Sequence, residues 1–277
     1  MLLLIVCRRL NPHIPVRSSH MLKRRALVVS VFTAPALCAL MPALVSTSAL
    51  AVTTAGKISV GVTTVVPPFS FMRNGKHSGI SNDILQKVAA LENLEIDYVP
   101  LKFDALIPAI QAGQIDIAVA GIFVTEARKK VVDFSDPYFT QGGIIVVPVN
   151  SPFKSVADLK GKTLACEQGS AALGIARENA EAWGVTLRVL PDPANMQLAM
   201  KAGDVDAMIY DSGIVAHQMR VEGAQPTIKQ ISGVLKPTGI AFAFPKGSKM
   251  VDVVNHGMAQ LRASGEIAKI LKSYGMD

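Results

Sequence analysis

One arginine, Arg128, follows the apolar run 115–120 and the short polar stretch that begins at Thr125. A guanidinium group is planar, permanently charged and carries a fork of N–H donors, so it suits a carboxylate held by two parallel hydrogen bonds. Asp211 follows a second apolar run, 205–210, and supplies the opposite charge, which suits an ammonium group. An arginine and an aspartate at two such positions predict a clamp for a small zwitterion.

Backbone N–H groups add anion donors to this clamp. The segment Gly169-Ser170-Ala171 leads from an apolar run into a helical pattern, and the N–H groups and dipole of a helix start favour an anion. Thr125 is expected to cap the helix that carries Arg128. Each charge-assisted hydrogen bond contributes on the order of 1.5–3 kcal/mol. A few such bonds predict binding in the micromolar range or tighter.

Each of these residues also has a simpler explanation when it is taken alone. An arginine at a helix start is more often a surface ion-pair residue, and an aspartate such as Asp211 is most often the N-cap of the helix that follows it. Phe103 and Phe123 alone would be core residues. The functional interpretation depends on the joint placement of these residues at strand ends.

The elements that position these residues alternate between strand-like and helical patterns. The first half predicts strands at 58–62, 95–100 and 115–120 and helices at 81–94 and 103–112, with Phe123 in a loop of three residues after the third strand. This β-α-β-α-β order predicts a parallel sheet with helices on its faces. The same pattern then restarts, with strands at 142–149, 162–166, 185–190, 205–210 and 240–244 and helices at 170–183, 195–202, 249–263 and 265–274.

A short internal repeat links the two halves. The segment AIQAGQID at 109–116 matches AMKAGDVD at 199–206 position by position, and each combines a helix end, a glycine C-cap and a strand that opens with Asp. The economical explanation is two lobes of similar topology, although A-x-x-A-G is also a common helix ending. Gly121 and Asp211 each lie five residues after the shared Asp, where ligands collect at the carboxyl ends of parallel strands.

The N-terminal region has the features of a secretory signal peptide. A basic stretch at 21–25 precedes a largely apolar stretch at 26–45, and an A-x-A cleavage signal occupies 49–51. The mature protein is therefore expected to start near Val52, after cleavage near Ala51. A membrane anchor is the weaker alternative, because prolines interrupt the apolar run.

Charge and cysteine content limit the function classes. Residues 1–20 look like sequence upstream of a start at Met21, and without the six basic residues before position 52 the 28 basic and 21 acidic residues become 22 and 21. The basic excess belongs to the leader, so nucleic acid is not an expected partner. Cys166 would be the single cysteine of the mature chain, and its apolar surroundings predict a buried thiol.

Several motifs together resemble a known family. They are GVTTVVPPF at 61–69, GISND at 79–83, DIAVAG at 116–121, TEAR at 125–128, DFSD at 133–136, DLKGK at 158–162, Gly169-Ser170 and Asp211. With these motifs the chain resembles, over 56–277, the periplasmic amino-acid-binding proteins of ABC importers, called bacterial extracellular solute-binding proteins of family 3.

The resemblance implies a two-lobed periplasmic-binding-protein fold of type II, in the α/β class, in which each lobe is a mainly parallel sheet flanked by helices. Two crossing strands near 142–147 and 239–244 would join the lobes and close them on a ligand by a hinge. Lobe 1 would comprise 52–142 plus 240–277, and lobe 2 would comprise 143–239. The resemblance further implies a periplasmic monomer that needs no cofactor or metal, captures a small zwitterionic ligand and delivers it to ABC importer permease subunits.

The resemblance also assigns site residues. Arg128 matches the carboxylate-binding arginine of the family, and Asp211 matches its ammonium-binding aspartate. Backbone groups of four residues would complete the clamp, and three side chains would meet the ligand's own side chain; these are Ala120, Gly121, Ser170 and Ala171, and then Phe103, Thr63 and Val66.

The chain departs from the family pattern at positions that bear on the ligand. Phe123 stands where members commonly carry Thr or Ser, whose hydroxyl helps to bind the ammonium group. Thr63 occupies a position that is often acidic in members for cationic side chains, which argues against basic amino acids. Phe103 and Phe123 together predict two aromatic rings that sandwich a flat or cyclic zwitterion, so an ectoine-type compatible solute is an alternative ligand.

Two further functions compete with ligand capture. Cyclohexadienyl dehydratases resemble this family, and Glu167 is the residue that would serve as their acid in the cleft. A sensor domain of a receptor or channel is the third candidate, but no signalling domain follows in this sequence. The sequence also lacks histidines at metal-ligand spacing and a glycine-rich phosphate loop.

Overall fold

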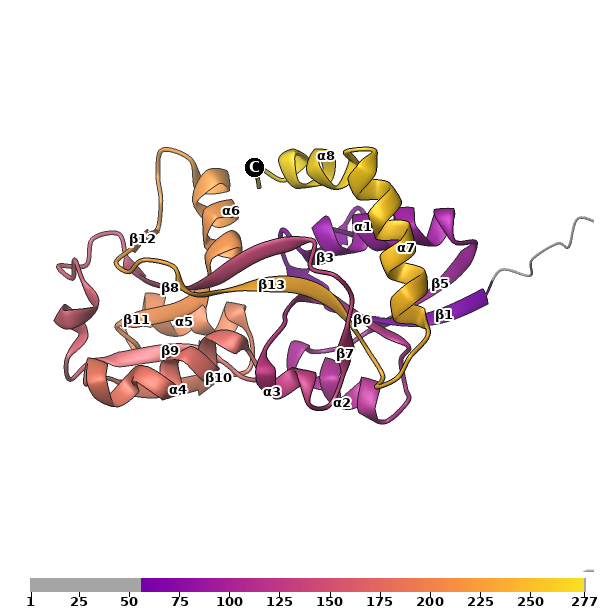
Figure 1. The fold of residues 1–277 in the computed structure, drawn as a ribbon. Coiled ribbons are helices and arrows are strands. Elements are labelled where there is room, and N and C mark those ends of the chain that lie inside the picture. The colour runs from indigo at the N-terminus through magenta and orange to yellow at the C-terminus, as the bar shows by residue number, and fades with distance from the viewer. Residues whose placement is uncertain (1–55, 277) are drawn as a thin grey trace, which may run out of the picture. The chain divides into compact units, whose positions relative to one another are not determined.

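The computed structural model describes residues 56–276 of the 277-residue chain (Figure 1). The predicted leader and signal peptide at 1–51 lie outside the described residues. Within the described part, every helix is too short or too polar to cross a membrane.

The first lobe is built on three parallel strands. β1 (Gly56–Val62) lies between β5 (Leu94–Pro100) and β6 (Ile117–Phe123) and pairs with both in parallel. A small antiparallel sheet follows β1, and helices cover the main sheet; these elements are β2 (Val65–Val66), β3 (Ser70–Arg73), β4 (Lys76–Ser78), α1 (Ile80–Leu91), the 3₁₀ turn η1 (Phe103–Ala105), α2 (Leu106–Gln111), α3 (Glu126–Lys129), α7 (Met250–Ala263) and α8 (Glu266–Ser273).

The second lobe repeats this plan. β9 (Thr163–Glu167) lies between β10 (Thr186–Leu190) and β11 (Ala207–Asp211) and pairs with both in parallel. The other elements of this lobe are the 3₁₀ turn η2 (Val156–Leu159), α4 (Ala171–Trp183), α5 (Pro193–Ala202), α6 (Ser212–Glu222) and β12 (Ile228–Gln230).

Two long strands connect the lobes. β8 (Phe139–Pro148) and β13 (Leu235–Phe244) pair antiparallel and run side by side across the middle of Figure 1. They complete the strand order β10-β9-β11-β8-β13-β6-β1-β5, and β7 (Asp133–Phe134) pairs with β13. The predicted α/β fold with two crossing strands is confirmed, while the lobe boundaries at 142/143 and 239/240 fall inside these strands and stay a prediction.

The internal repeat forms the same hydrogen bonds in both lobes. The Asp116 carboxylate accepts the backbone N–H of Ser59 in β1 at 2.8 Å, and the Asp206 carboxylate accepts the backbone N–H of Thr163 in β9 at 2.9 Å. In each case the Asp backbone N–H donates back to the same partner residue, at 2.9 Å. The repeated Asp therefore fastens the start of one parallel strand to its neighbour, which explains its place in the sequence pattern.

Some predicted boundaries were wrong. Phe123 was expected in a loop, but it is the last residue of β6, because β13 continues to pair with β6 up to Ile240 opposite Phe123. Gly121 and Asp211 belong to β6 and β11 rather than to the residues after them. The helix predicted at 81–94 ends at Leu91, since Asn93 takes a left-handed conformation with φ 52°.

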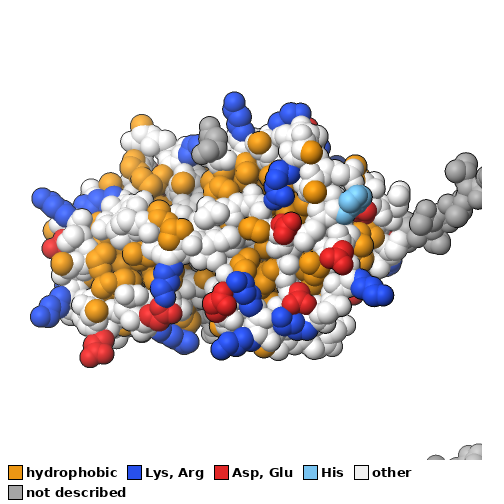
Figure 2. Space-filling model, in the orientation of Figure 1, with side chains coloured by type: hydrophobic (Ala, Val, Ile, Leu, Met, Phe, Trp, Pro, Cys, Tyr) orange, Lys and Arg blue, Asp and Glu red, His pale blue; other side chains and the backbone are white. Residues whose placement is uncertain are grey.

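Two expectations drawn from the composition concern Cys166 and the surface charges. Cys166 is fully buried, as predicted, and forms no disulfide within the described part of the chain; burial raises the pKa of its thiol to about 12. On the face shown in Figure 2, Lys and Arg side chains are interspersed with Asp and Glu and do not gather into one basic patch.

Candidate functional site

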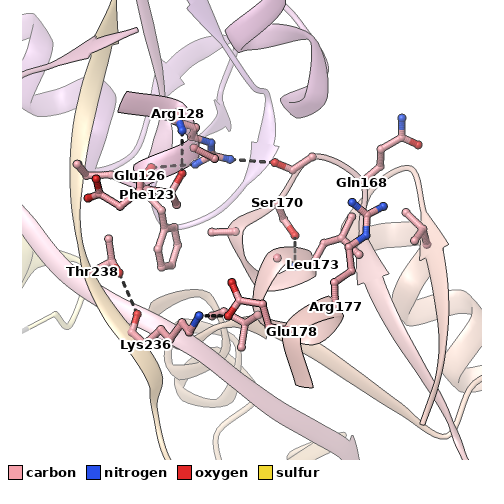
Figure 3. Close-up of a pocket in the computed structure, with 18 residues that line it drawn as sticks. Phe123, Glu126, Arg128, Gln168, Ser170, Leu173, Arg177, Glu178, Lys236 and Thr238 are labelled. Carbon is pink, nitrogen blue, oxygen red and sulfur yellow. Dashed lines mark hydrogen bonds and ion pairs between the residues drawn. The ribbon is translucent and has the colours of Figure 1, made fainter. Parts of the chain in front are cut away.

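Arg128 joins the two lobes through its side chain. Thr125 caps α3 as predicted, and its Oγ1 accepts the Arg128 backbone N–H at 3.3 Å. The guanidinium donates from Nη1 to the carbonyl of Phe123 at 3.0 Å and from Nη2 to the carbonyl of Gly169 at 2.9 Å (Figure 3). Phe123 belongs to β6 of the first lobe and Gly169 precedes α4 of the second. The cation therefore links one backbone carbonyl of each lobe.

The surroundings of Arg128 leave its charge only partly compensated. The guanidinium carbon lies 5.5 Å from the centroid of the Phe103 ring, which provides a cation–π contact. Burial lowers the pKa of Arg128 to about 10, and the charges of Asp211 and Glu167 oppose that shift. No carboxylate among the described residues comes within the 4.0 Å of an ion pair with Arg128. The group stays protonated near neutral pH and has capacity for an anionic partner.

Asp211 is free of the capping role that its position suggests. It is the N-cap residue of α6, yet its side chain accepts no capping hydrogen bond. Gln141 of β8 takes that role instead, because its Oε1 accepts the backbone N–H of Gly213 at 2.9 Å. Burial raises the pKa of Asp211 to about 7, and Arg128 opposes the rise. The carboxylate therefore has unused acceptor capacity among the described residues.

Ser170 and Ala171 form the predicted helix start. Ser170 is the N-cap of α4, and its hydroxyl accepts the backbone N–H of Leu173 at 3.0 Å. The N–H groups of the first helical turn have no partner within a helix, and the positive end of the helix dipole lies there. Ser170 and Ala171 both line the same cavity as Arg128.

Three neighbouring cavities lie around Arg128 and Phe103. The large cavity, of about 870 Å³, is lined by Phe123, Arg128, Ser170 and Ala171 among others (Figure 3). The middle cavity, of about 200 Å³, is lined by Phe103, Arg128 and Gly169.

The third, which we call the acidic cavity, has a volume of about 350 Å³. It is lined by Thr63, Val66, Phe103, Glu167 and Asp192 among others. Phe103 thus borders the middle and acidic cavities, and the pair formed by Arg128 and Gly169 borders the middle and large ones.

The structure does not bring all predicted site residues to these cavities. Ala120, Gly121 and Asp211 line none of the three. Gly121 has φ 69°, and a Cβ there would lie 2.8 Å from the Cγ of Phe69, so this glycine allows close packing of the Phe69 ring. Ala120 is buried in the core of the first lobe.

The two aromatic residues of the predicted sandwich face different cavities. Phe103 borders the middle and acidic cavities, whereas Phe123 is 3% exposed and borders the large one. Arg128 borders both the large and the middle cavity. The two rings therefore share none of the three cavities, and the predicted sandwich stays a prediction.

The first loop contributes buried residues to the acidic cavity. Val66 is 5% exposed and Thr63 is 2% exposed. The Thr63 hydroxyl already donates to the carbonyl of Ser70 at 3.4 Å, and the Ser70 hydroxyl donates to the carbonyl of Thr63 at 2.8 Å. Thr63 thus lines the cavity while it holds the loop together.

Two polar residues have roles at the site that were not predicted from the sequence. Gln141 was not predicted, although a glutamine in an apolar strand beside two glycines is an unusual feature. Glu167 was named as the acid of the alternative enzyme and not as a ligand-binding residue, yet it lines the acidic cavity and is 6% exposed. Within the described part of the chain, no group of three or more His, Cys, Asp or Glu side chains is placed to hold a metal ion.

Comparison with known proteins identifies the family. Residues 58–277 match the model of the bacterial extracellular solute-binding proteins, family 3. The arginine-binding extracellular protein ArtP of Bacillus subtilis is 28% identical over 224 residues, which cover 79% of this chain and 86% of that protein.

Solved structures agree with this assignment. An ancestral arginine-binding protein bound to arginine is 31% identical, with a TM-score of 0.73 over 80% of this chain and 99% of that one. The ancestral amino-acid-binding protein AncCDT-1, a precursor of cyclohexadienyl dehydratase, is 29% identical, with a TM-score of 0.71 over 79% of this chain and 94% of that one. The chain therefore belongs to family 3 of the bacterial extracellular solute-binding proteins.

Proposed function

We propose that this protein captures an amino acid between its two lobes and delivers it to the permease of an ABC importer. The observation that carries the proposal is the position of Arg128. Its guanidinium links a carbonyl of each lobe, lies over the Phe103 ring and borders both the large and the middle cavity.

A ligand carboxylate would improve on the bonds that Arg128 now makes. Hydrogen bonds between two charged partners are shorter and stronger than bonds to a neutral carbonyl. A carboxylate that replaces the Gly169 carbonyl would accept from Arg128 and would also meet the first N–H groups of α4, next to Ser170 and Ala171. Backbone groups of Ala120 and Gly121 belong to the same proposed clamp.

The cationic end of the ligand would then meet Asp211. Its carboxylate has no hydrogen-bond partner among the described residues, because Gln141 caps α6 in its place. An ammonium group would favour the ionised carboxylate and lower its pKa from about 7. Phe123 replaces a hydroxyl at this end, so Asp211 would carry more of the ammonium recognition. Thr63, Val66 and Phe103 would line the space for the ligand's side chain.

The family and the predicted leader support a proposal for the form and place of action. We propose a monomer in the periplasm, released by cleavage near Ala51. Lobe closure would occur about β8 and β13, with the lobe boundaries as predicted from the sequence.

Binding without chemical turnover is part of the proposal. The relatives named above are binding proteins, and one of them is a precursor of cyclohexadienyl dehydratase. The alternative enzyme would use Glu167 as its acid. Prephenate mixed with the purified protein should give no phenylpyruvate absorbance, and turnover would contradict the proposal.

A thermal-shift panel tests the capture function. Proteinogenic amino acids, ectoines, betaines and organic acids are added in turn to the purified protein, because a ligand that binds only the folded state raises the unfolding temperature. We expect stabilisation by one or more amino acids. Stabilisation by an ectoine alone would instead support the compatible-solute alternative, and no response to any amino acid would contradict the proposal.

A further inference from the structure

The acidic cavity contains a buried carboxylate whose bonding capacity is unused. Glu167 is the last residue of β9, lines this cavity of about 350 Å³ and is 6% exposed. Among the described residues, no side chain or backbone N–H donates a hydrogen bond to its carboxylate, and no basic group pairs with it within 4.0 Å. The carboxylate oxygens are not sealed off from the cavity, so a cation that enters the cavity can pair with a carboxylate that has no other partner.

The electrostatic surroundings of Glu167 are mainly acidic. The charged or titratable groups around its carboxylate are Lys102, Asp104, Arg128, Asp192, Tyr210 and Asp211. Burial raises the pKa of Glu167 to about 8, Asp211, Asp192 and Asp104 add to the rise, and Arg128 opposes it. Lys102 lines the cavity but is exposed to solvent. Four acids, Glu167, Asp104, Asp192 and Asp211, thus stand against two bases, Lys102 and Arg128, so the ionised acids favour a cation in the cavity.

The acidic cavity is connected to Arg128, the proposed carboxylate-binding residue, by lining residues that neighbouring cavities share. The middle cavity shares Arg128 with the large cavity and Phe103 with the acidic one. A ligand with its carboxylate at Arg128 would send its side chain past the Phe103 ring toward Glu167. Aromatic faces attract cations, so this route favours a positively charged chain end.

We propose that Glu167 is the specificity-determining residue of the site and that the bound amino acid has a side chain ending in a positively charged group. This inference rests on the proposed function and names its ligand class. The cationic group forms a charge-assisted pair with ionised Glu167. The proton that Glu167 carries in the unliganded protein passes to the solvent when the pair forms.

This inference revises the expectation drawn from Thr63 alone. The absence of an acid at Thr63 argued against basic ligands, but Glu167 supplies an acid to the same cavity from the opposite lobe. The sequence could not place Glu167 and Thr63 on one cavity, because more than a hundred residues separate them.

A matched pair of ligands tests the inference. L-Arginine and L-citrulline have similar length, but only arginine carries a charged chain end. Both are titrated calorimetrically into the purified protein and into Glu167→Gln between pH 6 and pH 9. Glu181→Gln, an exposed acid on α4, is the control. Both ligands have the same ammonium group to bind Asp211, so the effect of Asp211 protonation on affinity cancels in the ratio of the two affinities.

We expect the native protein to bind arginine about ten-fold or more tighter than citrulline at pH 9, since a charge-assisted bond replaces a neutral one. The preference should fall as pH decreases below the Glu167 pKa of about 8, because protons then compete with arginine. Glu167→Gln should show a small preference that does not change with pH, and Glu181→Gln should behave as the native protein does.

Several results would overturn the inference. They are an arginine preference in the native protein that does not vary with pH, an unchanged preference in Glu167→Gln, or binding of other amino acids but not arginine. If no amino acid binds at all, the proposed function itself fails. If Glu167→Gln does not fold, a second measurement on the native protein tests the inference. Arginine and citrulline are each titrated in two buffers of different ionisation heat, which gives the number of protons released on binding. Greater release with arginine than with citrulline supports the inference, and equal release overturns it.

Discussion

Three charged side chains, Arg128, Glu167 and Asp211, influence one another at the interface between the lobes. Burial acts on all of them in the direction that disfavours charge, so it lowers the pKa of Arg128 to about 10 and raises those of Glu167 and Asp211 to about 8 and 7. At neutral pH the unliganded site therefore holds a full positive charge and incompletely ionised acids. A zwitterionic ligand would supply the missing partners.

The raised pKa of Glu167 predicts a change of stability with pH. The fold favours its protonated form, so this contribution to the free energy of unfolding is complete below about pH 4.5 and is lost as pH rises to about 8. Glu167→Gln removes the loss. We expect the variant to gain up to about 4 kcal/mol on the native protein between pH 5 and pH 9, without ligand. Calorimetric unfolding of both proteins at these pH values measures the gain, and a constant difference would contradict the prediction.

At the residue scale, the positions of the charged site residues could be predicted from the sequence, whereas the contacts that surround them could not. Arg128 and Asp211 follow apolar runs and Ser170 starts a helical pattern, so all three could be found from local spacing. The roles of Gln141 and Glu167 depend on contacts between distant segments. Gln141 caps a helix 72 residues later in the chain, and no local pattern encodes such a partner.

At the scale of elements, β8 and α6 are fastened to each other beside Asp211. The Gln141 side chain accepts the backbone N–H of Gly213, and the Ser212 hydroxyl accepts the backbone N–H of Gly142 at 3.3 Å. The amide nitrogen of Gln141, Nε2, is buried without a partner among the described residues. The side chain cannot be turned round to relieve this, because Nε2 and the Gly213 backbone N–H would then be two donors facing each other. A crossing strand thus positions the helix that presents the proposed ammonium ligand.

This arrangement separates the structural role of Gln141 from the binding role of Asp211. Gln141→Ala leaves the buried N–H of Gly213 unpaired, so we expect it to lower the free energy of unfolding by about 1–3 kcal/mol. Asp211→Ala removes a carboxylate that caps nothing, so it should leave the stability of the unliganded protein within about 0.5 kcal/mol or raise it. Urea unfolding of both variants without ligand measures this contrast. A larger loss in Asp211→Ala than in Gln141→Ala would contradict it.

The elements were largely predictable and their ends were not. Apolar periodicity located the main strands and helices, and the repeat at 109–116 and 199–206 predicted equivalent strands in two lobes. The small sheet β2–β4 escaped prediction because its strands have only two to four residues. The end of β6 was misplaced because Gly121 resembles a strand end, whereas pairing with β13 carries the strand on to Phe123.

At the scale of the whole molecule, ligand capture requires that both lobes hold one ligand. Membership of family 3 places the protein outside the cytoplasm, and its fold joins two similar lobes through β8 and β13. Arg128 already links the lobes through the Phe123 and Gly169 carbonyls, and Glu167 and Asp211 belong to the lobe opposite Arg128. The central claim is that the carboxylate of a bound amino acid replaces the Gly169 carbonyl as the acceptor of Arg128.

Calorimetric titration of L-arginine, or of whichever amino acid gives the largest thermal shift, into the native protein and into Arg128→Ala tests this claim most directly. Arg188→Ala, which removes an exposed arginine paired with Asp204 in the second lobe, is the control. We predict that Arg128→Ala weakens binding by about 3 kcal/mol or more, because the ligand carboxylate loses a buried charged partner, and that Arg188→Ala binds as the native protein does. Unchanged affinity in Arg128→Ala, with the protein still folded, would contradict the account.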